Sequence, residues 1–132
     1  MGQMVGTVIL AGAAVFFLGT SVAAFVSPAM FGARLGFTMA GADGLNEVRA
    51  QYGGFFLAAA IVSVAGLTGA VPRSGALLVM AVVFGGLIFG RLVSLALDRG
   101  FTGYGATIRA LFAIDTVGLV AALVALGLAA RA

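Results

Sequence analysis

A short polar stretch near the middle of the chain carries most of the side chains that could do chemistry. An acid, a base, two amides, a phenol and a glycine pair occur together in Asn46-Glu47-Val48-Arg49-Ala50-Gln51-Tyr52-Gly53-Gly54. The stretch opens a segment that then runs apolar to about Ala70. Charged side chains at the start of a membrane-spanning helix are costly unless they are paired with other polar or charged groups. The candidate partners are Arg91 and Asp115. The sequence therefore predicts one polar cluster, comprising Asn46, Glu47, Arg49, Gln51, Tyr52, Arg91 and Asp115.

The residue types that are missing narrow the chemistry of this polar cluster. The chain has no cysteine and no histidine, which removes thiol chemistry, cysteine–histidine zinc sites and imidazole bases. An enzyme built on this sequence would have to use Glu47, Asp115, Tyr52 or Tyr104 as its acid or base. There are four carboxylates in all, and some lie next to arginines. We therefore expect no metal and no cofactor, and we assign no catalytic residue.

The composition is that of a membrane protein. Of the 132 residues, 63% are hydrophobic and 8% are charged, whereas soluble domains carry about 25% charged residues. The mean hydropathy is +1.24, so lipid is the expected solvent. The net charge of +3 comes from scattered arginines beside apolar runs. This pattern indicates arginines at membrane interfaces and not a nucleic-acid-binding surface.

Four segments are long and apolar enough to cross a bilayer, which takes about 20 residues. The predicted spans are residues 5–26, 45–70, 76–97 and 106–130. Ser27-Pro28 ends the first span because proline cannot continue a helix. Val71-Pro72-Arg73-Ser74-Gly75 is a tight turn, so the second and third spans should be antiparallel neighbours. Residues 1–132 are thus predicted to form one all-α transmembrane domain, a bundle of four helices.

The segment between the first two spans, Ala29 to Gly44, is too short and too rich in glycine to span. Met30, Phe31, Leu35 and Phe37 together with Arg34 would suit a short helix lying at the membrane interface. An irregular loop is the alternative.

Antiparallel threading brings ionisable groups from three spans into one half of the membrane. Asp115 lies on the order of 13 Å inside its span at 1.5 Å per residue, and Arg91 lies at a similar depth in the third span. Such groups cost roughly 2.5–3.5 kcal/mol each near the bilayer centre. We therefore predict that Arg91 and Asp115 form an ion pair. Glu47 is expected to meet Arg49, Arg91 or Arg109.

Helical spacing predicts which faces point into the bundle. In the second span the polar stripe Glu47, Ala50, Gln51 and Gly54 is expected to face inward. In the third span Gly90, Arg91, Ser94 and Asp98 share one side. Small residues let helix backbones approach closely in lipid, and the glycines expected at helix contacts are Gly53, Gly54, Gly86, Gly90 and Gly118.

These motifs carry a family resemblance. Asn46-Glu47-x-Arg49-x-x-Tyr52-Gly53-Gly54, followed by a proline turn, Gly85-Gly86 and Gly90-Arg91-Leu92, resembles the bacterial four-span proteins catalogued as domain of unknown function 4345. The resemblance covers nearly the whole chain. It implies a four-helix bundle in a bacterial inner membrane, and it implies no activity. The acid of the last span is commonly Glu in that family, whereas here it is Asp115, one methylene shorter.

Three functional hypotheses follow. The first is a non-enzymatic accessory or interaction subunit whose Glu/Arg/Asp network fixes the bundle, within a homo-oligomer or a larger membrane complex. The second is a binder or carrier of a lipid, another small amphiphile or a proton. The third is an enzyme that acts on a lipid-soluble substrate. A distant resemblance to the small four-span glutathione-linked membrane enzymes supports this hypothesis. A scaffold predicts a filled interior, whereas a binder predicts a cavity lined by Tyr52 and the glycines.

Overall fold

The computed structural model describes residues 1–39 and 41–130, and within them helices are the regular secondary structure. Four helical runs are long and apolar enough to cross a membrane. They are α1 (Gly2–Val26), the continuous run α3–η1–α4 (Gly41–Val48, Arg49–Gly54 and Phe55–Thr68), α5 (Arg73–Leu97) and α6 (Ala106–Ala129). The sequence predicted the same four runs with ends that differ by a few residues. The largest difference is at the second run, which begins at Gly41 and not at residue 45.

Helix ends follow the residues that cannot continue a helix. α1 stops at Val26, and Pro28 opens the next helix at its first turn, where its missing N–H is not needed. α4 is capped by Gly69, whose φ of 80° is in the left-handed region that glycine adopts without strain. Pro72 then precedes α5. The chain therefore turns back sharply between α4 and α5, as the proline turn predicted.

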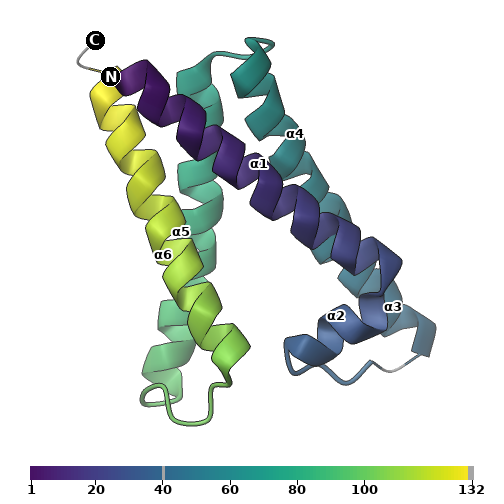
Figure 1. Cartoon of the computed structure of the whole chain (residues 1–132). Coiled ribbons are helices and arrows are strands. Elements are labelled where there is room, and N and C mark those ends of the chain that lie inside the picture. The colour runs from purple at the N-terminus through teal and green to yellow at the C-terminus, as the bar shows by residue number, and fades with distance from the viewer. Residues whose placement is uncertain (40, 131–132) are drawn as a thin grey trace.

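A short helix connects the first two spans. α2 (Pro28–Arg34) lies beside the lower ends of α1 and α3 in Figure 1. It ends before a turn at Gly36, which has a φ of 85°. Of the two alternatives for this segment, the short helix is the one observed, although it stops before Leu35 and Phe37.

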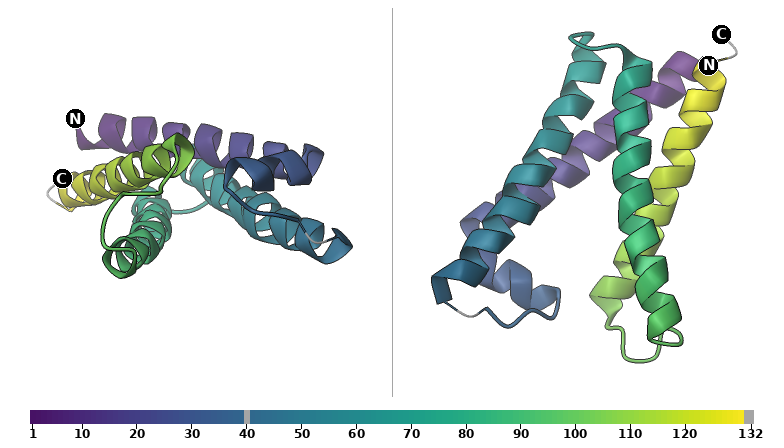
Figure 2. Two further views of the ribbon diagram at one scale, coloured as in Figure 1. Left: turned by 90° about the horizontal axis from the view of Figure 1, so that it is seen from below. Right: turned by 180° about the vertical axis from the view of Figure 1, so that it is seen from behind.

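The long helices form two pairs, α1 with α4 and α5 with α6 (Figures 1 and 2). The pairs meet at the end that carries the amino terminus and the α4–α5 turn, which we call the closed end. They diverge toward the end that carries α2, α3 and the α5–α6 loop, which we call the open end. Small side chains allow the meeting: a Cβ added at Gly66 of α4 would lie 2.5 Å from the Cβ of Ala76 of α5.

The core lies between the two pairs, and phenylalanine rings fill its centre. Phe17 of α1 is fully buried, and its ring centroid lies 5.2 Å from those of Phe16, Phe56 and Phe84. Such aromatic pairs contribute about 0.5–1.5 kcal/mol each beyond the area that they bury. This packing lies near the middle of the long helices and leaves the open end to other contacts.

Candidate functional site

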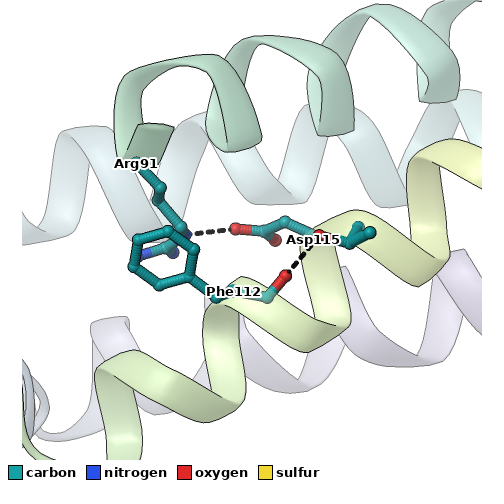
Figure 3. Close-up of polar contacts among 4 residues, drawn as sticks. Arg91, Phe112 and Asp115 are labelled. Carbon is teal, nitrogen blue, oxygen red and sulfur yellow. Dashed lines mark hydrogen bonds and ion pairs between the residues drawn. The ribbon is translucent and has the colours of Figure 1, made fainter. Parts of the chain in front are cut away.

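An ion pair joins α5 to α6 toward the open end. Arg91 Nε donates to Asp115 Oδ2 over 2.5 Å, and the ring of Phe112 lies beside the guanidinium with its centroid 5.7 Å from Cζ (Figure 3). The second dashed line in Figure 3 is the bond from the Thr116 hydroxyl to the Phe112 carbonyl, 2.7 Å long. The predicted pairing of Arg91 with Asp115 is confirmed. It arises because the antiparallel helices α5 and α6 bring the two residues near each other in depth, and the long arginine side chain spans the remaining difference.

The two partners of this pair have different surroundings. The Asp115 side chain is 1% exposed and lies against the bundle interior, whereas the Arg91 side chain is 20% exposed. Only Nε of the five guanidinium donors is bonded to Asp115. Within the described residues no hydrogen bond or ion pair occupies the two terminal amino groups of Arg91. The arginine therefore neutralises the buried acid with one edge and keeps donors for something else.

Arg91 opens into a cleft of about 750 Å³ at the open end, which we call the open-end cleft. One wall comes from the end of α2 and the turn after it, one from Tyr52, and the others from α5, the α5–α6 loop and α6. The lining residues are Ala33, Arg34, Leu35, Gly36, Phe37, Tyr52, Gly86, Leu87, Gly90, Arg91, Ser94, Asp98, Gly103, Tyr104, Gly105, Thr107, Ile108, Leu111 and Phe112. Segments far apart in the sequence thus enclose one space.

The cleft walls are mostly apolar, with charges at a few places. Leu87, Leu111 and Phe112 supply apolar surface, and the charged lining residues are Arg34, Arg91 and Asp98. Two cations therefore face one anion, since Asp115 lies behind Arg91 and outside the lining. An apolar space with a few polar groups that converge on it is the usual character of a small-molecule site.

The α5–α6 loop, which forms one wall of the cleft, is held in place by its own side chains. The Tyr104 hydroxyl donates to Asp98, and this hydrogen bond raises the pKa of Tyr104 above its ordinary value. Arg109 donates to the carbonyls of Tyr104 and Phe101, over 2.9 and 3.1 Å. Arg109 is thus engaged with the backbone of the loop, and not with Glu47.

The structure corrects the position of the polar stripe of the second span. Asn46, Glu47, Arg49 and Gln51 are exposed, and within the part of the chain that the structure describes no ion pair involves Glu47. Val48, Gly53 and Phe56 occupy the inward face instead. Apolar side chains gain more from the contact with α1, and polar ones near the end of a span can turn outward. Glu47 and Gln51 line a separate space of about 550 Å³ beside residues 36–39.

Tyr52 is the member of the predicted stretch that reaches the cleft. Its ring packs against the rings of Phe31, Phe37 and Phe56, with centroids 5.2, 6.2 and 5.7 Å away. It therefore joins α2 and the turn after it, residues 28–37, which we call the α2 segment, to the second span at the edge of the cleft. Of the seven residues of the predicted polar cluster, the structure brings together Tyr52, Arg91 and, behind the arginine, Asp115.

The predicted packing glycines fall into two groups. A Cβ added at Gly53 would lie 2.9 Å from the ring of Phe25, and one at Gly118 would lie 2.7 Å from the ring of Phe84, so both sit at close helix contacts. The prediction is wrong for the other three. A Cβ at Gly86 or Gly90 would meet no atom within 4 Å, because these glycines line the cleft, and Gly54 faces only its own helix.

Sequence reasoning missed part of the site. Arg34 and Phe37 line the cleft although they were expected to lie on the membrane surface, and Gly66 was not expected at a helix contact. One signal in the sequence did indicate the α5 wall of the cleft. Helical spacing places Gly90, Arg91, Ser94 and Asp98 on one side of the third span, and all four line the cleft. Within residues 1–39 and 41–130, no three carboxylates lie close enough together to hold a metal ion.

Four apolar helices that could each cross a bilayer, with an ion pair inside them, define a small multi-pass membrane protein. Its sequence belongs to the family described as domain of unknown function (DUF4345), whose profile matches residues 5–126. The resemblance drawn from the motifs of the second and third spans is therefore confirmed. No curated protein and no solved structure matches the chain.

Proposed function

We propose that this protein binds a small amphiphile in the open-end cleft, without catalysing a reaction on it. The observation that carries the proposal is a mostly apolar space of about 750 Å³ into which the partly exposed Arg91 opens. Ligand pockets for small molecules are commonly about 300–1,000 Å³ in volume. Apolar walls suit a hydrocarbon chain, and the arginine suits a polar head.

The form of the cleft favours binding over a purely structural role for the polar residues. A scaffold would fill the space beside the ion pair with side chains. Here Gly86 and Gly90 leave it open on the α5 wall, and no atom lies within 4 Å of a Cβ added at either position. The absence of a side chain at both positions keeps room beside Arg91.

The test is to fill the cleft and examine what co-purifies. Gly90→Leu places a large side chain in the open space, whereas Gly75→Leu makes the same change on α5 away from the cleft, also where a Cβ meets nothing within 4 Å. We expect native mass spectrometry of protein purified from membranes in neutral detergent to show a small bound lipid. The bound species should be present in the wild type and in Gly75→Leu, and lost in Gly90→Leu. Identical spectra for the two variants, or no bound species in the wild type, would contradict the proposal.

A second candidate function is that of an accessory subunit in a protein complex of a bacterial inner membrane. The observation in its favour is the outward-facing polar stripe of the second span, where Glu47 and Gln51 are exposed. Polar groups on a membrane helix are stabilised by a protein partner or by water, and not by lipid chains. A second copy of this chain or another membrane protein would supply such a partner.

This candidate is tested by cross-linking, which the absence of native cysteine makes clean. Ala50→Cys puts one thiol within the exposed stripe, and Val82→Cys puts one on an exposed part of α5 as a matched control. For Ala50→Cys alone, we expect a specific cross-linked product in native membranes. If the partner is a second copy of this chain, oxidation should give a disulfide-linked dimer. If the partner is another membrane protein, a bifunctional thiol-to-amine cross-linker should give a larger adduct. Equal products from both positions would argue against an interface here.

A further inference from the structure

We infer that the ligand of the open-end cleft is a single-chain amphiphile with an anionic head, a carboxylate or a phosphate, which is received by the terminal amino groups of Arg91. This inference rests on the proposed function and names the chemistry of its ligand. Arg91 Nε is occupied by Asp115, and the other edge of the guanidinium has no partner within the described residues. That edge presents paired N–H donors, the geometry in which arginine binds carboxylate and phosphate.

The charges around the cleft favour an anion. The charged lining residues are Arg34, Arg91 and Asp98. Asp98 accepts a hydrogen bond from the Tyr104 hydroxyl, which occupies part of its capacity. Arg109 is held by backbone carbonyls of the loop and does not line the cleft. Among the charged side chains that reach the space, the cations therefore outnumber the anion.

Asp115 sets the strength of this preference. It is 1% exposed and bonded directly to Arg91, so it offsets part of the positive charge that an anionic head would meet. The pair thus holds an arginine inside a membrane helix at a low cost and still offers donors to a ligand. Removal of the acid alone should strengthen anion binding, whereas neutralisation of both partners should abolish the preference for an anion.

The apolar walls accommodate one chain. Leu87, Leu111 and Phe112 lie on the same cleft as Arg91, so a chain can run along α5 and α6 from a head placed at the guanidinium. The volume of about 750 Å³ suits a single-chain molecule better than a lipid with two long chains. Dodecanoate and dodecyl phosphate are suitable probes, and dodecanol is the neutral molecule with the same chain.

The experiment is competition against radiolabelled dodecanoate on the purified full-length chain in a neutral detergent. We expect dodecanoate or dodecyl phosphate to bind about tenfold or more tightly than dodecanol, as a charge-assisted hydrogen bond predicts. The comparison between the two anions then distinguishes a carboxylate ligand from a phosphate one. In Arg91→Gln/Asp115→Asn, which keeps the net charge because one arginine and one aspartate are lost, the three molecules should bind equally.

Asp115→Asn alone provides a second test that needs no large change in the bundle, and it should increase the preference for the anions. An unchanged or smaller preference in this variant would overturn the inference. If the wild type binds dodecanol as tightly as the anions, the cleft binds amphiphiles without distinguishing an anionic head from a neutral one. The inference then fails and the proposed function stands. If none of the three molecules binds, both fail.

Discussion

Arg91 and Asp115 contribute unequally to the stability of the molecule because only one of them is enclosed on all sides. Asp115 is 1% exposed, and its carboxylate has the guanidinium as its ionic partner. Arg91 is 20% exposed and can extend along the cleft, as long basic side chains do near the ends of membrane helices. Loss of the arginine strands a buried charge, whereas loss of the acid leaves a cation that can still reach a polar environment.

This asymmetry predicts different stabilities for the two single variants. Arg91→Leu should lower the free energy of unfolding by about 3 kcal/mol, because it leaves the buried carboxylate of Asp115 without an ionic partner. Asp115→Asn should cost less, about 1 kcal/mol, and Arg91→Leu/Asp115→Asn should recover part of the loss of Arg91→Leu. Thermal unfolding in detergent at neutral pH measures all three. If Arg91→Leu and Asp115→Asn lowered the free energy of unfolding equally, the difference in exposure between Arg91 and Asp115 would have no effect on stability.

At the scale of elements, the second span contains a π-helical turn at Arg49–Gly54. Turns of this kind interrupt α-helices and occur frequently at functional sites. Here the Gly53 carbonyl accepts a hydrogen bond from the Ser21 hydroxyl of α1 over 2.8 Å, and the Phe25 ring covers Gly53. These contacts fix α1 against the turn. They hold Tyr52 where its ring meets both Phe31 and Phe37 of the α2 segment.

The α2 segment and the α5–α6 loop close the cleft from opposite sides, and each is held locally. Tyr52 supports the first, and Arg109 with the Asp98–Tyr104 bond supports the second. The two walls belong to different helix pairs. The width of the cleft therefore depends on how the pairs meet, which is a property of the whole molecule.

At the scale of the whole molecule, the pairs α1–α4 and α5–α6 meet at the closed end and separate toward the cleft (Figures 1 and 2). Gly66 lies where they meet, since a Cβ there would be 2.5 Å from Ala76 Cβ and 3.0 Å from Leu10 Cδ1. The glycine brings three helices together at one point. Any side chain at this position must push the pairs apart.

Gly66→Ala is therefore expected to destabilise the bundle by about 1–3 kcal/mol, the usual cost of overpacking a filled core. Gly75→Ala, on α5 where a Cβ meets nothing within 4 Å, should be neutral or slightly stabilising, because alanine is the better helix former. Thermal unfolding of the two variants in detergent makes the comparison. A Gly66→Ala protein as stable as Gly75→Ala would show that the contact between the pairs yields without cost.

The sequence by itself determined the features that depend on distance along the chain. The four spans, the turn at Pro72 and the depth of Arg91 and Asp115 follow from hydropathy, helix breakers and the fixed rise per residue. The pairing of Arg91 with Asp115 could be predicted because a charge inside a membrane needs a partner near its own depth, and these two residues are the nearest in depth on antiparallel helices.

Only the tertiary structure decided which way each face turns and what it meets. The polar stripe at Glu47 and Gln51 has a helical period, but that period does not say whether the polar or the opposite face packs on α1. Gly86 and Gly90 have the spacing of packing glycines and line a cleft, whereas Gly66 has no such partner in sequence and lies at the tightest contact. These outcomes depend on contacts between residues distant in the chain, because the angle at which two helix pairs meet is set by all their side chains together.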